Sequence, residues 1–223
     1  MFYLEEIQPK VYCAYFDDSY TMCMAFARFQ EYYENESPVF RDQSFSMFDL
    51  MEWYAKKHGA GSFTYTRDIL GFNLPCSIIG EVAAKGIPDL NKYDHMMFAL
   101  ESLVRAKDPD LDSCYLLGLD RSGNPEDQLH EIAHGLYFTN AKYRKDMDKL
   151  VRALPLSKRG VIEECLRDMG YGGNVMVDEI QAYLATGIFP EWKELKLSNN
   201  LKAFKSVFDK HYEVGYGKSS EKV

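Results

Sequence analysis

Three residues within one short stretch have the types and the spacing of a site that binds a metal ion and activates water: His130, Glu131 and His134. The pattern His-Glu-x-x-His puts two imidazoles one helical turn apart on the same face, so both can reach one ion. Imidazole nitrogen is a preferred ligand of zinc. Glu131 lies one residue further round the helix, where it can take a proton from a metal-bound water. The stretch therefore predicts a metal site with a general base beside it.

The residues before the motif predict the helix that this geometry needs. Asn124 is a suitable N-cap, Pro125 is favoured in the first turn, and Glu126 and Asp127 suit the positive end of the helix dipole. The uncharged residues at positions 132, 133, 135 and 136 allow this helix to be buried. The alternative is an ordinary surface helix that happens to carry two histidines.

A later helix, expected from about Met176 to Ala185 and ended by Gly187, offers a third ligand. A catalytic zinc site has three protein ligands and one position for water. Glu179 lies between apolar residues, and a buried carboxylate needs a partner because desolvation of an unpaired charge is costly. Asp178 is the rival ligand. In a purely structural interpretation, both acids only stabilise the first turn of their helix.

These two segments resemble the gluzincin class of zinc metallopeptidases, which combine His-Glu-x-x-His on one helix with a glutamate on a later helix. Here 44 residues separate His134 from Glu179, and the sequence from Asp178 to Tyr183 is similar to the glutamate helix of that class. The resemblance covers about a quarter of the chain, from Asn124 to Gly187. Residues 1–110 resemble no family.

The resemblance implies a zinc-dependent peptidase that acts on a peptide or protein substrate. His130, His134 and Glu179 would hold Zn²⁺ with one position open for water. Glu131 would take a proton from that water and pass it to the leaving amine. One alternative is a mononuclear iron enzyme with two histidines and a carboxylate. The other is a non-catalytic metal-binding or interaction protein.

The resemblance also implies a donor for the developing oxyanion, usually a tyrosine or a histidine. Tyr171, in the glycine-rich loop before the glutamate helix, is the first candidate, and Tyr183 and His211 follow. The chain departs from the class at two positions. Asp127 is acidic where the peptidases usually carry a small or apolar residue. Tyr183 replaces an aspartate that orients a zinc-bound histidine in several members, and the acids that could supply the missing carboxylate are Asp178, Glu164 and Asp168.

Other residues with reactive side chains are expected to be structural. His58 and His95 share no spacing with the motif, and Cys165 is expected to belong to a hydrophobic core. The five cysteines are an odd number without a Cys-x-x-Cys pair, which favours free thiols over a disulfide framework. With no signal-like N-terminus and no membrane-length apolar run, the expected location is the cytoplasm.

The net charge of −8 argues against nucleic-acid binding, because phosphate neutralisation supplies most of that affinity, and no Lys/Arg cluster is expected to offset it. A membrane partner is not expected either, and the oligomeric state is left open.

The remaining pattern predicts an α+β fold of the zincin-like kind, rich in helix with a small sheet. A single domain over residues 1–223 is expected, with a lobe at 1–110 and the catalytic half at 111–223. The expected strands are 11–16, 62–66 and 113–119, and residues 71–75 are expected to form a structured loop. The expected helices, besides the two already given, are 19–33, 47–57 with Ser46 as cap and Gly59 as stop, 91–106, 140–153, 157–169 and 201–211.

Overall fold

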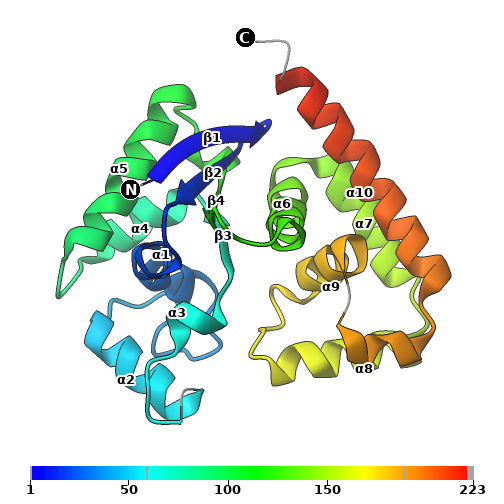
Figure 1. Cartoon of the computed structure of the whole chain (residues 1–223), viewed down its shortest axis with the longest axis horizontal. Coiled ribbons are helices and arrows are strands. Elements are labelled where there is room, and N and C mark those ends of the chain that lie inside the picture. The colour runs from blue at the N-terminus through cyan, green and yellow to red at the C-terminus, as the bar shows by residue number, and fades with distance from the viewer. Residues whose placement is uncertain (1, 59, 188, 220–223) are drawn as a thin grey trace. The chain divides into compact units, whose positions relative to one another are not determined.

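A computed structural model of the chain describes residues 2–58, 60–187 and 189–219 (Figure 1). It confirms the α+β class, since the chain is 62% helical with a small four-stranded sheet in the described residues. The chain divides into two compact units. Unit 1 comprises residues 1–5 and 12–124, and unit 2 comprises residues 6–11 and 125–223. The expectation of a single domain stays a prediction.

The sheet contains β1 (Phe2–Gln8), β2 (Val11–Phe16), β4 (Tyr115–Asp120) and β3 (Gly71–Pro75), in the order β1-β2-β4-β3. The strands predicted at 11–16 and 113–119 are thus confirmed. β3 pairs antiparallel with β4, with Gly71 opposite Leu119 and Pro75 opposite Tyr115. A two-residue connection joins β1 to β2, and this length suits antiparallel neighbours.

Two sequence expectations in this unit are wrong. Residues 71–75, expected to be a loop, form β3. The proline is tolerated because it ends an edge strand, where its missing N–H disrupts no ladder. Residues 62–66, expected to be a strand, instead lead into the short helix α3 (Tyr65–Asp68). The strand β1 and the helix α4 (Ser77–Lys85) were not predicted.

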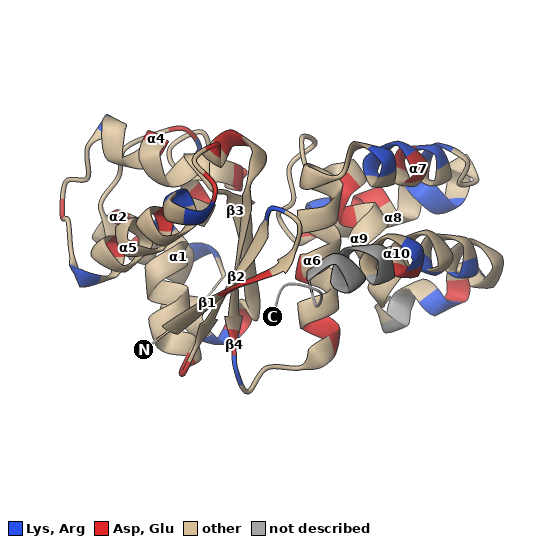
Figure 2. Ribbon diagram, turned by 90° about the horizontal axis from the view of Figure 1, so that it is seen from above, with Lys and Arg blue, Asp and Glu red and all other residues tan. Residues whose placement is uncertain are grey.

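The other helices of unit 1 are α1 (Ser19–Glu34), α2 (Met47–Lys57) and α5 (Lys92–Lys107), all close to their predicted bounds. Ser46 caps α2 in a reciprocal pair with Asp49, as predicted, whereas Gly59 lies outside the described residues. Figure 2 shows α1, α2, α4 and α5 on the same side of the sheet. The core between these layers contains the fully buried Phe26, Phe72 and Leu116.

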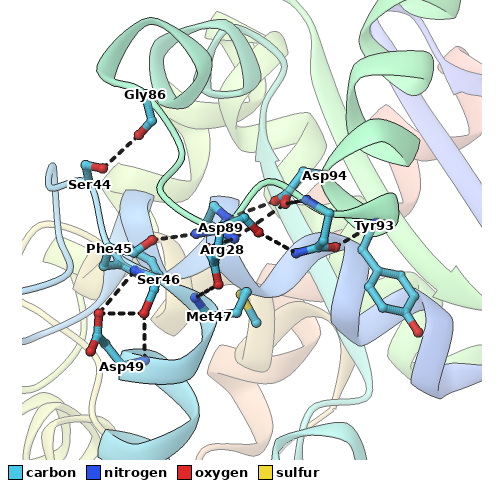
Figure 3. Close-up of polar contacts among 11 residues, drawn as sticks. Arg28, Ser44, Phe45, Ser46, Met47, Asp49, Gly86, Asp89, Tyr93 and Asp94 are labelled. Carbon is cyan, nitrogen blue, oxygen red and sulfur yellow. Dashed lines mark hydrogen bonds and ion pairs between the residues drawn. The ribbon is translucent and has the colours of Figure 1, made fainter.

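The buried guanidinium group of Arg28 links two loops of unit 1 to two of its helices (Figure 3). Arg28 of α1 is 2% exposed, and its Nε lies 2.8 Å from Asp94 Oδ1 at the start of α5. Its other nitrogens donate to Asp89 and to the backbone carbonyl of Phe45. Asp89 in turn accepts from the backbone N–H of Met47. One side chain therefore joins a helix to two loops and the start of another helix.

Unit 2 is helical. It contains α6 (Pro125–Thr139), α7 (Ala141–Arg152), α8 (Leu156–Asp168), α9 (Met176–Thr186), a 3₁₀ turn (Pro190–Leu195) and α10 (Ser198–Ser219). The first four confirm the predicted helices, and α10 starts earlier and ends later than expected. Helix α9 packs against α6, α7, α8 and α10, so it is the central helix of the unit.

Charge is distributed unevenly along the chain. Unit 1 has ten Lys and Arg against eighteen Asp and Glu, whereas unit 2 has sixteen of each. The expectation of no cationic cluster is wrong, because α7 is strongly basic (Figure 2) and the cations continue into α8: Lys142, Arg144, Lys145, Lys149, Arg152, Lys158 and Arg159. Among the described residues, no helix combines the length and the apolar character needed to cross a bilayer.

Candidate metal centre

Helix α6 carries the His-Glu-x-x-His motif deep into unit 2. It begins at Pro125, as predicted, and its residues 131 to 136 are all buried. Gly135 allows this depth, because a Cβ added there would lie 2.6 Å from Cγ1 of the buried Val11. The motif is therefore not on a surface helix, which removes the alternative of two ordinary exposed histidines.

Three side chains from two helices converge as the sequence predicts. His130 and His134 Nε2 lie 3.2 Å apart, and the carboxylate oxygens of Glu179 on α9 lie 3.8 Å and 3.7 Å from them. A tetrahedral zinc ion with bonds near ~2.1 Å separates its ligand atoms by about 3.3–3.6 Å. In the described part of the chain, these three residues are the group whose donor atoms gather closely enough to hold an ion. The rival ligand Asp178 does not belong to this group.

The three side chains differ in exposure. The side chain of His130 is 17% exposed, against 2% for His134 and 5% for Glu179. Solvent therefore reaches the cluster from the His130 side. Asp127, one turn before His130 on α6, is half-buried, and burial followed by the charge of Glu126 raises its pKa.

The two imidazoles have opposite protonation tendencies. Burial lowers the pKa of His130 well below its ordinary value, and the neighbouring His134 lowers it further. Burial also opposes a charge on His134, but Asp178 and Glu179 outweigh it and raise the pKa to about 10. His130 is therefore a neutral ring at neutral pH. The carboxylates around His134 favour positive charge at this point, and a bound cation can supply it in place of the proton.

Asp178 contacts His134 from outside the cluster. Its Oδ1 lies 3.0 Å from His134 Nδ1, the ring nitrogen that faces away from the cluster. The other two acids considered from the sequence, Glu164 and Asp168, lie exposed on α8. Of the three acids that the sequence leaves open, Asp178 is therefore the one that the structure places beside His134. Metal-bound histidines commonly donate their second ring N–H to a carboxylate in this way.

Glu131 lies beside the cluster and outside the ligand set. It is 8% exposed, and its charge contributes to the raised pKa of both His134 and Tyr183. A carboxylate at this place can exchange a proton with a water bound next to His134. The role of Glu131 as the base stays a prediction.

The tyrosines form the wall next to His130. The ring of Tyr183 packs on the ring of His130 at 4.3 Å between centroids, and the hydroxyl of Tyr171 lies 3.4 Å from that of Tyr183. Tyr171, the first candidate from the sequence, is therefore linked to the cluster through Tyr183, the second candidate. Burial, followed by the charge of Glu179, raises the pKa of Tyr183, so its hydroxyl stays protonated and able to donate.

Other candidate residues lie elsewhere. His211, on α10, contacts Asn140 and the ring of Tyr143, and its Nε2 is 3.8 Å from Asp146. His58 and His95 belong to unit 1, where each packs against aromatic rings. Cys165 is half-buried on α8, and the other four cysteines are buried as free thiols.

Two further residues near Asp178 were not predicted as site residues from the sequence: Gln181, which contacts Asp178, and Tyr143, which contacts Gln181. Gln181 and Tyr143 are both fully buried and hydrogen-bonded to each other. The spacing of Asp178 and Gln181 places them on one face of a helix, but only the fold brings Tyr143 of α7 to them.

Comparison with models of known protein families finds no match, and neither curated proteins nor solved structures show a significant similarity to the chain.

Proposed function

We propose that unit 2 binds a zinc ion and that the chain hydrolyses peptide bonds with it. The observation that supports this most is the convergence of His130, His134 and Glu179, from two helices, at separations that suit one tetrahedral ion. Two histidines and a glutamate, with one position left for water, are a known ligand set of catalytic zinc. A structural zinc usually has four protein ligands, so this set favours a catalytic role.

In the proposed reaction, each neighbouring side chain has one task. A zinc ion held by His130, His134 and Glu179 would supply Lewis acidity and would make a water molecule more acidic, with a pKa of about 7. Glu131 is the residue that would accept a proton from the attacking water and donate it to the leaving amine. Tyr183, with Tyr171 behind it, donates a hydrogen bond to the carbonyl oxygen as negative charge develops there. The greater exposure of His130 gives the side from which substrate approaches.

The zincin-like fold, the peptide or protein substrate and the cytoplasmic location belong to the same proposal. The absence of a nucleic-acid or membrane partner also stays a prediction. The lysines and arginines of α7 make direct binding tests with nucleic acid and with membranes worthwhile.

Metal analysis of the purified chain is the first test. We expect close to one zinc per chain and its loss in His134→Ala. One iron per chain would instead support the oxygen chemistry that two histidines and a carboxylate can also perform. A chain that binds neither metal with measurable affinity would contradict the proposal.

Glu131→Gln tests the reaction itself. We expect the variant to keep its zinc and its thermal midpoint and to lose about 10²–10⁴-fold in kcat on a peptide library, because proton transfer is removed. Glu126→Gln, on the exposed first turn of the same helix, is the matched control and should keep its activity. Hydrolysis by Glu131→Gln at the wild-type rate would contradict the assigned base.

A further inference from the structure

A chain of hydrogen bonds leads away from the metal cluster into the centre of unit 2. Asp178 Oδ1 lies 3.0 Å from His134 Nδ1 and accepts from Gln181 Nε2 at 2.9 Å. Gln181 Nε2 also donates to the backbone carbonyl of Ala133 at 3.3 Å. Gln181 Oε1 accepts from the hydroxyl of Tyr143 at 2.7 Å. The chain thus connects α6, α9 and α7.

The chemistry of the groups fixes the direction of every bond in this chain. A backbone carbonyl only accepts, so the atom of Gln181 that faces Ala133 must be the amide nitrogen. The amide oxygen then faces Tyr143, whose hydroxyl donates. An ionised carboxylate also only accepts, so at Asp178 the proton must come from His134 Nδ1. In the neutral ring that a metal ligand must be, a proton on Nδ1 leaves the lone pair of His134 on Nε2, the atom that faces Glu179.

We propose that Asp178, Gln181 and Tyr143 are positioning residues that hold His134 in the tautomer and the orientation that bind the metal. Gln181 is 0% exposed and bonded at both ends of its amide, so it cannot rotate without breaking bonds in the core. It therefore fixes Asp178, which is only partly buried and which two donors hold in place. This inference rests on the proposed metal site.

The arrangement also accounts for Tyr183, which replaces the orienting aspartate of the gluzincin pattern. The carboxylate comes from the residue before the glutamate ligand and not from the fourth residue after it. Asp178 and Gln181 are three residues apart on α9, so they are neighbours on one face of the helix. Position 183 can therefore be a tyrosine, and the ring of Tyr183 packs on the ring of His130.

Zinc affinity, measured by competition with a chromophoric chelator, tests the proposal without any activity assay. We expect Asp178→Asn to weaken zinc binding by about 10–100-fold. We expect Tyr143→Phe to weaken it by about fivefold, the value of one hydrogen bond. The Co²⁺-loaded Asp178→Asn variant should keep the intense absorption of a tetrahedral site, since its three ligands remain. Collapse of that spectrum would show Asp178 to be a ligand and overturn the proposal.

Two matched controls separate positioning from stability. Asp168→Asn removes an exposed acid of unit 2 and should leave zinc affinity within about twofold of wild type. Tyr137→Phe removes a hydroxyl that donates at 2.7 Å to Asp148 between α6 and α7 and that is not part of the chain from His134 to Tyr143. We expect it to lower the thermal midpoint as Tyr143→Phe does and to leave zinc affinity unchanged.

The outcomes distinguish this inference from the proposed function. If wild type binds zinc but Asp178→Asn binds it equally well, the positioning chain is wrong and the metal site stands. Equal losses of affinity in Tyr143→Phe and Tyr137→Phe would also overturn it, because they would reflect general destabilisation. If wild type binds no zinc, the metal site and the positioning chain fall together.

Discussion

Gly135 directly follows His134, a proposed metal ligand, in α6, at a place where even a methyl group has no room. A Cβ there would lie 2.6 Å and 3.1 Å from the two Cγ atoms of Val11, which is fully buried. A glycine inside a helix costs about 1 kcal/mol relative to alanine. The close approach of Val11 explains why a glycine is tolerated at this position of the helix.

Gly135→Ala should therefore destabilise unit 2, despite the better helix propensity of alanine. Overpacking costs about 1–3 kcal/mol and the better helix propensity offsets about 1 kcal/mol of it, so we expect a net loss of up to about 2 kcal/mol in urea unfolding. Combined with Val11→Ala, which removes the two methyl groups, the same change should become neutral or stabilising. An equal loss in both backgrounds would show that Val11 is not the cause.

Arg28 of α1 is a charged residue that the fold buries almost completely. Its guanidinium is held by Asp94, Asp89 and the carbonyl of Phe45 (Figure 3). Loss of one partner from a buried ion pair leaves a desolvated charge without compensation. Nothing in the sequence marks Arg28, because the acids that pair with it lie more than sixty residues further along the chain.

Arg28→Met should destabilise unit 1 by about 3–5 kcal/mol, since it leaves Asp94 buried without its cation. Chemical denaturation followed by circular dichroism measures the change. Arg105→Met is the matched control: Arg105 pairs with Glu101 one turn away on α5, and its side chain is more than half exposed. We expect a loss below about 0.5 kcal/mol there. Similar losses for both variants would contradict the role given to Arg28.

At the scale of elements, the sequence predicts those that carry their own local signals. Ser46 caps α2 as predicted, Asn91 caps α5 in the same reciprocal way, and both helices lie close to their predicted ranges. The segment 71–75 contains Gly, Asn and Pro, which favour a turn, yet pairing with β4 makes it a strand. Tertiary pairing outweighs local preference there, and one sequence does not reveal its partner strand.

In the candidate site too, local patterns predict some residues and tertiary packing determines the others. The spacing within α6 determines that His130 and His134 share a face, so local geometry alone predicts the pair. Glu179 could be chosen because an acid among apolar residues of a buried helix needs a partner. The choice of Asp178 as the contact of His134 depends on how α9 rotates against α6. Packing sets that rotation, and no local pattern encodes it.

At the scale of the whole molecule, the proposed metal ligands, their neighbours and the proposed positioning chain all belong to unit 2, while the net negative charge belongs to unit 1. A ligand that binds only the folded state stabilises it by about 2.7 kcal/mol at a hundred times its Kd. If the units unfold independently, zinc should stabilise unit 2 alone.

Hydrogen exchange with and without zinc measures this directly. With zinc at a hundred times its Kd, we expect the slowest amides of α6 and α9 to exchange about a hundredfold more slowly. The amides of α1 and α5 in unit 1 should be unchanged, because their opening does not release the metal. His134→Ala, treated in the same way, should show no zinc effect in any helix. Equal protection of α1 and α9 would instead mean that the chain unfolds as one cooperative domain, which is what its sequence alone predicts.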